Sequence, residues 1–299
     1  MRTAFIKQLV KEAEKNDRIF LIVGDLGFSV VEEFEHQFPD RFLNAGIAEQ
    51  NMVGLAAGLA MQGFNVYIYS IANFPTLRCM EQIRYDVAYH HLNVKVVSVG
   101  AGYAYGPLGA SHHATEDLGM LRTIPDMIVC SPGDPYEAQA ITTFSANYDG
   151  PMYLRLGKAG EKLVHDAPIG HLQVGQLLPV KEENNKKAVI ACGSILDAAK
   201  TQMAEKGLAY DLWSIPFVKP IDRQQVKSLC ERYPEGFMIL EEHQKSCGVG
   251  SAIIEVLSDL YEEGQITEFP KVKRLAINDE FVTIVGSQNY LRERAGLVL

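Results

Sequence analysis

The sequence has 299 residues, 47% of them hydrophobic, with a formal net charge of -9 at pH 7 and an isoelectric point near 5.4. This length and composition allow one large domain or two ordinary ones, each with a buried core. The acidic balance argues against nucleic acid as a partner, because binding to the phosphate backbone depends on clustered Lys and Arg.

The cysteines and the N-terminal segment bear on the compartment. Five cysteines are scattered along the chain and never form a CxxC pair, which predicts neither a disulfide framework nor a zinc site. The first 18 residues, MRTAFIKQLVKEAEKNDR, have the charge pattern of an amphipathic helix and not of a signal peptide. No apolar run approaches membrane-spanning length. We therefore expect a globular protein of the reducing cytoplasm.

Short apolar runs alternate with helical patterns in the first half of the chain. After the N-terminal helix the pattern predicts a strand at 19–25, a helix at 49–62, a strand at 65–70, a helix at 78–91 and a strand at 94–100. A strand at 127–132, a helix at 134–147 and a strand at 151–157 follow. This alternation predicts a parallel sheet with helices on both faces.

The second half repeats the alternation after an irregular polar segment. Residues 161–186 are expected to be a linker, because the segment is polar and runs into KEENNKK. Strands are expected at 187–194, 210–220, 237–243 and 272–278, with helices at 195–207, 222–233 and 250–264. The expected fold class is α/β with two tandem domains, 1–160 and 187–299, each a mostly parallel sheet flanked by helices.

One carboxylate stands out in RFLNAGIAEQNMVGLAAGLAMQGF, residues 41–64. Glu49 opens a predicted helix that is otherwise rich in Gly, Ala and aliphatic side chains, so a neighbouring backbone or a flat ligand can approach closely. One interpretation is an acid that complements the helix dipole. The other is a carboxyl whose pKa is raised by apolar surroundings, which makes it a proton donor. Periodicity does not choose between them.

Several longer segments resemble one family. DRFLNAGIAEQNMVGLAAGLAMQG (40–63), GASHHATEDLGMLRTIPDMIVCSPGDPYEA (109–138) and GPMYLRLGK (150–158) resemble the pyrimidine-binding domain of transketolases. VKPID (218–222), EEH (241–243) and CGVGSA (247–252) resemble the family's C-terminal domain. The resemblance covers nearly the whole chain. It implies a transferase that moves a two-carbon ketol unit between sugar-like substrates with the help of thiamine diphosphate.

The resemblance also implies roles for residues around that cofactor. Glu49 would hydrogen-bond the ring nitrogen of the aminopyrimidine and activate the cofactor, and His112 would contact the substrate. Phe74 would stack on the pyrimidine ring. Because the alignment here can shift by a few residues, Ile71 and Leu77 remain alternatives for the cofactor contact.

Four further positions correspond to substrate contacts in the family. One or both of Arg155 and Lys158, in RLGK, would meet a phosphate or another anion of the substrate, although both could also be ordinary strand-end charges. Arg2 and Ser29 correspond loosely to other substrate contacts. His243, in LEEHQKSCGVGS, is expected to form an interdomain hydrogen bond and not to bind a metal.

Full-length transketolases also carry a domain with G-D-G and N-N motifs, which holds the diphosphate and a divalent metal. In VGDLGF, Gly24 and Asp25 lack the second glycine, and we interpret them as a strand-end turn. The sequence therefore predicts the C-terminal subunit of a split transketolase, with no metal site of its own. A separate N-terminal subunit would supply the ligands of the diphosphate and of Mg²⁺ or a similar ion, around a homodimeric core within a heterotetramer.

Two departures from the family bear on the substrate. Ordinary transketolases carry a histidine and an acid where this sequence has Gly100 and Leu108. Their loss predicts weak recognition of a standard aldose phosphate and a specialised anionic or nucleotide-linked sugar instead. Two other interpretations stay open. One is the beta component of a 2-oxo acid dehydrogenase, and the other is a regulatory paralogue that catalyses nothing.

Overall fold

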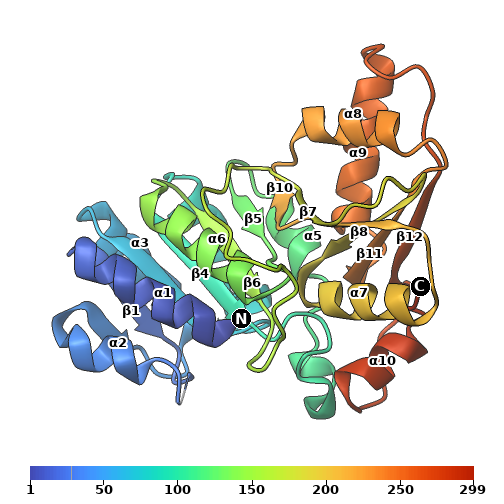
Figure 1. Ribbon diagram of the computed structural model, residues 1–299. Helices are drawn as coiled ribbons and strands as arrows, with labels where there is room; N and C mark the ends of the chain where they lie inside the picture. Colours follow the sequence, from blue (N-terminus) through green and yellow to red (C-terminus); the bar gives the residue numbers. More distant parts are fainter. Residues whose placement is uncertain (28) are drawn as a thin grey trace.

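The computed structural model describes residues 1–27 and 29–299 and contains two mostly parallel sheets that lie side by side (Figure 1). The N-terminal sheet has the strand order β10-β5-β6-β4-β3-β1-β2, and all of its neighbours are parallel except β10 and β5. Its strands are β1 (Ile19–Val23), β2 (Phe42–Asn44), β3 (Asn65–Ile71), β4 (Val94–Val99), β5 (Ile128–Cys130), β6 (Met152–Leu156) and β10 (Phe217–Lys219).

The C-terminal sheet has the order β12-β11-β8-β9-β7, with β7 antiparallel to β9 and the other neighbours parallel. Its strands are β7 (Leu178–Lys181), β8 (Ala188–Cys192), β9 (Asp211–Ser214), β11 (Phe237–Gln244) and β12 (Val272–Ile277). The two-domain α/β class expected from the sequence is therefore confirmed.

One strand prediction and the linker prediction were wrong in detail. The single strand expected at 210–220 is two strands, because Pro216 has no N–H to continue a ladder, and the chain crosses after it to the N-terminal sheet as β10. The expected linker 161–186 contains β7, which pairs with β9 in antiparallel register. Through β10, the second domain contributes an edge strand to the N-terminal sheet.

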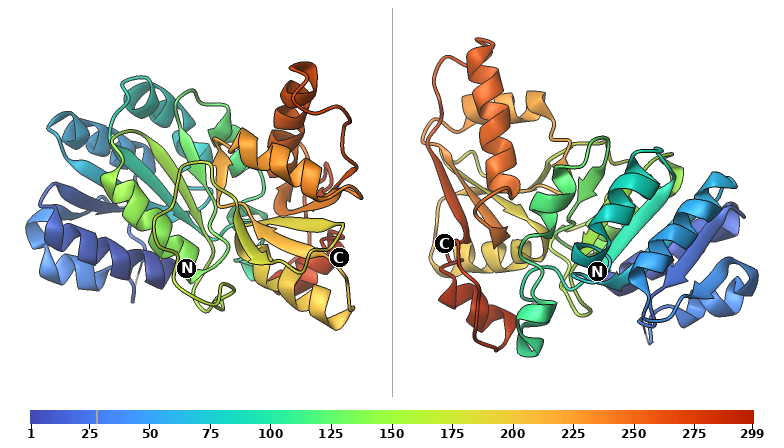
Figure 2. Two further views of the ribbon diagram at one scale, coloured as in Figure 1. Left: turned by 45° about the horizontal axis from the view of Figure 1, so that its top comes forward. Right: turned by 180° about the vertical axis from the view of Figure 1, so that it is seen from behind.

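Helices cover both faces of each sheet (Figure 2). Helices α1 and α6 pack together over one face of the N-terminal sheet, and α3 lies on the other. In the second domain α8 and α9 lie on one side of the sheet and α7 on the other. The α-helices are α1 (Arg2–Lys15), α2 (Glu32–Gln37), α3 (Glu49–Met61), α4 (Met80–Gln82), α5 (Asp117–Arg122), α6 (Pro135–Asn147), α7 (Leu196–Glu205), α8 (Arg223–Arg232), α9 (Val249–Glu262) and α10 (Gln288–Arg294).

The helix expected at 78–91 is irregular. A 3₁₀ turn, Leu77–Cys79, is followed by α4 and then by a π-helix, Ile83–Ala88. The wider i to i+5 turn keeps Ile83, Val87 and Ala88 against the buried core. The segment therefore packs its apolar side chains against the core as an α-helix would, but with a π-helical backbone. No helix in the described part of the chain combines the length and apolar character that crossing a bilayer requires.

A buried polar cluster holds the segment between the domains onto α6. One carboxylate oxygen of Asp134 accepts the backbone N–H of Glu137, and the other accepts those of Val164 and His165 at 2.9 and 3.0 Å. Glu137 accepts the N–H of Gly133 at 2.6 Å and faces His165 Nε2 at 2.7 Å. All four carboxylate oxygens accept N–H groups, so hydrogen bonds hold this cluster together, and we call it the clasp.

The clasp predicts a pH dependence of stability. Burial opposes the charged imidazole, but the hydrogen bond and charge of Glu137 outweigh it and raise the pKa of His165. Because the pKa of His165 is higher in the folded than in the unfolded protein, its contribution to stability is fully present below the unfolded-state pKa of about 6.5. This contribution is lost as the pH rises through the folded-state pKa. The stability difference between wild type and His165→Gln should therefore shrink as the pH rises.

Urea denaturation of both proteins at about pH 6 and about pH 8.5 measures this difference. Glu137→Gln should remove the same pH dependence, because the amide cannot favour the imidazolium by charge. A difference between wild type and His165→Gln that is independent of pH would contradict the assignment.

Candidate active site

Several residues singled out in the sequence lie at the carboxyl edge of the N-terminal sheet. Gly24 follows β1, Phe74 lies just beyond β3, Gly100 follows β4 and Lys158 lies just beyond β6. Helix α3 begins with Glu49 after β2. Ligand sites of parallel α/β sheets lie outside the carboxyl ends of the strands, so the topology alone concentrates these residues.

Glu49 is buried and paired. Its side chain is 2% exposed, and Oε2 accepts a hydrogen bond from Arg78 Nη1 at 2.5 Å. Arg78 is 48% exposed and comes from the irregular helical segment after β3. The sequence predicted an acid among apolar side chains, and that prediction missed this cation. The carboxylate of this pair is buried, and the guanidinium that balances its charge is half-exposed. Arg78 can therefore move away from Glu49 into solvent without being buried elsewhere.

Gly24 and the hydroxyl of Ser70 lie next to Glu49. Gly24, in the strand-end turn that the sequence predicted, has no side chain here, and a Cβ on it would lie 3.6 Å from Glu49 Cγ and 3.5 Å from Ser70 Oγ. Ser70 Oγ is buried and has no hydrogen-bond partner in the described residues. An acid and this hydroxyl, both able to hydrogen-bond a ligand, therefore lie next to the same backbone position.

Phe74 lies between Glu49's counterion and His112. The guanidinium of Arg78 is 5.2 Å from the centre of the Phe74 ring, and the His112 ring meets the same phenyl edge to face at 5.5 Å. Phe74 and His112 are both half-buried. Of the three candidates for the cofactor contact, Phe74 is the one in contact with both neighbours. Ile71 ends β3, and Leu77 lies exposed in the following turn.

His112 is carried by residues 100–115, which we call the histidine loop. Asn73 Nδ2 donates to the carbonyls of Ser111 and His113 at 3.0 and 2.8 Å. His113 is buried, with Nε2 3.2 Å from the Gly106 carbonyl oxygen, whereas the His112 ring faces Phe74. The structure therefore gives the two adjacent histidines different surroundings, and His112 is the one beside the predicted cofactor residue.

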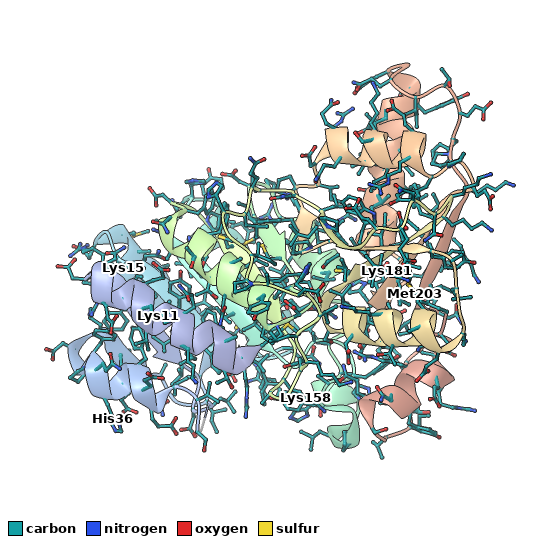
Figure 3. The ribbon with its side chains drawn as sticks, in the orientation of Figure 1. Lys11, Lys15, His36, Lys158, Lys181 and Met203 are labelled. Carbon is teal, nitrogen blue, oxygen red and sulfur yellow. The ribbon has the colours of Figure 1, made fainter. Side chains whose placement is uncertain are left out.

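Arg2 and Lys158 lie in adjacent segments although they are far apart in the sequence. The N-terminal amine of Met1 donates to the Lys158 carbonyl at 3.2 Å and pairs with Glu161. Arg2 Nε is buried without a hydrogen-bond partner in the described residues. Lys158 lies at the lower edge of the N-terminal domain in Figure 3. The fold thus brings the start of α1 to the segment that follows β6.

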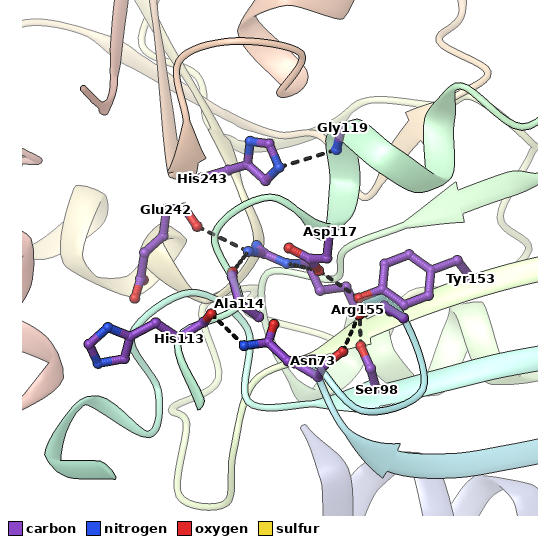
Figure 4. A network of polar contacts seen from close by, with 12 residues as sticks. Asn73, Ser98, His113, Ala114, Asp117, Gly119, Tyr153, Arg155, Glu242 and His243 are labelled. Atoms are coloured by element: carbon purple, nitrogen blue, oxygen red, sulfur yellow. Dashed lines mark hydrogen bonds and ion pairs between the residues drawn. The ribbon is translucent and has the colours of Figure 1, made fainter. Parts of the chain in front are cut away.

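Arg155 does not lie where the sequence placed it. It is 2% exposed, with Nε 2.7 Å from Asp117 Oδ2 and with Nη2 donating to the carbonyls of Ala114 and Glu242 (Figure 4). Burial opposes the charge, but the Asp117 carboxylate outweighs it and raises the pKa of Arg155. A charged guanidinium with these partners is a structural link between domains, and its geometry gives no support to the predicted contact with a substrate anion.

His243 forms the interdomain hydrogen bond that the sequence predicted. Burial lowers the pKa of His243, and Nε2 accepts the backbone N–H of Gly119 at 3.1 Å. The other ring nitrogen lies 2.8 Å from the carbonyl oxygen of Gln244. A neutral imidazole that donates on one side and accepts on the other satisfies both contacts.

Ser29 lies apart from these contacts in the structure. It has a left-handed backbone with φ of 61°, is exposed, and its N–H donates to Glu32 Oε1 at 2.6 Å. Its predicted substrate role stays a prediction.

Tyr105 takes the space that a larger residue at position 100 would need. Gly100 has φ of +104°, and a Cβ built on it would lie 2.4 Å from Tyr105 Cδ2. The histidine of ordinary transketolases is therefore excluded at this position unless Tyr105 moves. Leu108 is 56% exposed on the same loop. The two departures found in the sequence thus lie in one loop, Gly100 buried and Leu108 exposed.

Comparisons with known proteins agree with this geometry. The family described as transketolase, pyrimidine binding domain, matches residues 1–160, and the family described as transketolase, C-terminal domain, matches residues 176–286. An apulose-4-phosphate transketolase subunit of Actinobacillus succinogenes is 32% identical over 94% of this chain and 88% of that protein. The 6-deoxy-6-sulfo-D-fructose transketolase subunit of a Clostridium species is 30% identical over 99% of this chain and 90% of that protein.

A solved structure is similar along nearly the whole chain. The split gene transketolase that was solved as an inactive beta4 tetramer has a TM-score of 0.84 and 33% identity, and the match covers 99% of this chain and 93% of that one. Sequence and fold therefore lead to the same family. The chain belongs to the transketolase family, with both the pyrimidine-binding and the C-terminal domain.

The Glu49 and Arg78 pair predicts a measurable coupling. Arg78→Ala should lower the free energy of unfolding by about 1–3 kcal/mol, because it leaves a buried carboxylate without its partner. In a Glu49→Gln background the same change should cost clearly less. Urea denaturation of the four proteins measures the coupling.

The matched control is Arg84→Ala. Arg84 is an exposed arginine of the adjacent π-helix whose guanidinium lies over Tyr85. Its removal should change stability by no more than about 0.5 kcal/mol in either background. Additive costs of Glu49→Gln and Arg78→Ala would show that the pair does not interact.

Proposed function

We propose that this chain is the C-terminal subunit of a thiamine-diphosphate-dependent split transketolase and transfers a two-carbon ketol unit between sugar substrates. The observation that carries the proposal is the convergence of Glu49, Phe74 and His112 from three separate segments onto one edge of the sheet. The relatives named as transketolase subunits support this reaction over that of a 2-oxo acid dehydrogenase.

The chain's own residues suit the pyrimidine half of thiamine diphosphate. When bound, that cofactor supplies an electron sink for carbon–carbon bond cleavage. Glu49 would hold a proton on the ring nitrogen once Arg78 gives up its hydrogen bond, and Ser70 offers a further hydroxyl beside it. Phe74 would cover the ring, and the buried position of Glu49 keeps water from its carboxyl group.

The diphosphate and its divalent ion would be held by a separate N-terminal subunit. Helix α3, which begins with Glu49, presents an outward face where Cβ atoms on Gly54 and Gly58 would meet nothing within 4 Å. Large apolar side chains are exposed around these glycines, as is typical of protein interfaces. This α3 face comprises Gly54, Leu55, Gly58 and Met61.

A subunit docked on the α3 face would contact the helix that begins with Glu49, and two chains would then complete one site. The similar split gene transketolase is described as an inactive beta4 tetramer, in keeping with a beta chain that needs a partner. We propose the same dependence here, in a heterotetramer with a homodimeric core located in the cytoplasm.

The substrate would be a specialised anionic sugar. Arg2 and Lys158 supply positive charge near the end of β6, and His112 supplies an imidazole. Tyr105 fills the space beside Gly100, which removes the room for a histidine. Two relatives of similar identity carry names with different sugars, apulose 4-phosphate and 6-deoxy-6-sulfo-D-fructose. Both of these sugars are anionic and neither is a standard aldose phosphate, which supports the same class of substrate here.

The proposed function predicts that the purified chain alone has no ketol transfer activity and does not bind thiamine diphosphate with magnesium. Activity and binding should both appear when the cognate N-terminal subunit is added. Calorimetric titration and a coupled ketol transfer assay, each with and without the partner, measure this. Tight metal-dependent binding by the chain alone would contradict the shared site, and an inactive complex that still assembles would favour a regulatory paralogue.

Glu49→Gln tests the role of the acid in the assembled complex. The amide cannot share a proton with the ring nitrogen, so exchange of the thiazolium C2 proton should slow by roughly 10²–10⁴-fold while assembly is kept. Exchange followed by proton NMR, with assembly followed by gel filtration, separates the two effects. Near-normal exchange would reduce Glu49 to a helix-end acid.

A further inference from the structure

The end of β11 runs alongside the histidine loop and contacts it at successive residues. The N–H of Tyr103 donates to Glu242 Oε1 at 2.5 Å. The N–H of Gln244 donates to the Thr115 carbonyl at 2.8 Å, which joins the backbones of the two segments directly. His243, between these two β11 residues, accepts the N–H of Gly119 just beyond the loop (Figure 4). The C-terminal domain therefore contacts the histidine loop near both of its ends.

Glu242 is itself held in place by the C-terminal segment. Its carboxylate is buried, and Oε2 accepts a hydrogen bond from Arg292 Nε at 2.6 Å. Gln288 Nε2 donates to both carboxylate oxygens at 3.1 and 3.2 Å. Because Arg292 and Gln288 both belong to α10, the acid that receives the Tyr103 N–H is fixed by an element outside the loop.

The loop approaches Glu242 too closely for any side chain at position 102. Gly102 has φ of +58°, and a Cβ on it would lie 2.5 Å from Glu242 Cγ. Gly102 also exchanges backbone hydrogen bonds with Ala114, at 2.9 and 3.0 Å, which ties the two ends of the loop to each other. A displacement at Tyr103 would therefore be transmitted to the segment that carries His112.

We infer that Glu242 is a positioning residue, through which the C-terminal domain holds His112 in register with Phe74. The inference rests on the proposed function in one respect, the contact of His112 with the substrate. It assigns the second domain a part in substrate binding, in addition to its contribution to stability.

Glu241 offers a matched control one residue away. It is also buried, but its carboxylate accepts the N–H groups of Val249 and Gly250 at 2.7 and 2.9 Å and caps the N-terminus of α9. Successive side chains of a strand point to opposite faces, so the two acids serve different contacts. Glu241→Gln and Glu242→Gln make the same chemical change, and only the second lies against the histidine loop.

The experiment compares both variants in the complex with the N-terminal subunit. In Glu242→Gln, backbone amides of residues 100–115 should exchange with solvent about tenfold faster, because a charge-assisted hydrogen bond is weakened. The kcat/KM for the sugar substrate should fall by about 10- to 100-fold, while exchange of the cofactor C2 proton stays within about twofold of wild type. This split separates a misplaced His112 from a damaged cofactor site.

In Glu241→Gln the thermal midpoint should fall, with loop exchange and kcat/KM within about twofold of wild type. Equal loop exchange in the two variants, or equal kcat/KM, would overturn the inference. If Glu242→Gln does not fold, amide exchange in the wild-type complex tests the inference. Residues 102–115 should then be protected from exchange as strongly as β11. Fast exchange of the loop amides alone would refute the assignment. An inactive wild-type complex would refute the proposed function, and the exchange comparison would still test Glu242.

Discussion

The buried guanidinium of Arg155 connects three parts of the molecule that the chain keeps far apart. Its Nε pairs with Asp117 at the start of α5, and its Nη2 donates to Ala114 in the histidine loop and to Glu242 in the second domain. Removing either partner of such a pair leaves a charge without compensation in the interior, which costs about 3–5 kcal/mol. The interdomain arrangement and the position of the histidine loop therefore depend on the same side chain.

The histidine loop and the α3 face differ in how far the rest of the chain covers them. The loop and the C-terminal domain pack against each other, whereas the α3 face presents glycines and large apolar side chains to solvent. Under the proposed function, the substrate side of the site is organised within this chain and the diphosphate side is supplied by the partner subunit. The counterion Arg78 satisfies the buried acid in the meantime.

Much of the fold was predictable because periodicity reports burial on a regular backbone. Buried runs such as 94–100 and helices such as 49–62 appear close to the expected bounds. Predictions failed where the outcome depended on distant partners. The strand β10 leaves its own domain after Pro216, and β7 forms inside the expected linker because β9 is there to pair with it. Neither partner is visible in the local pattern.

The site shows the same division. The sequence by itself determined the family and singled out Glu49 and His112 as predicted site residues, because these lie in contiguous motifs with characteristic neighbours. The tertiary structure alone decided that Arg78 is the counterion of Glu49, and that Arg155 is buried against Asp117 instead of facing a substrate. A side chain's role depends on which charges and hydrogen-bonding groups surround it after folding, and those come from strands and loops that only the packed sheet brings together.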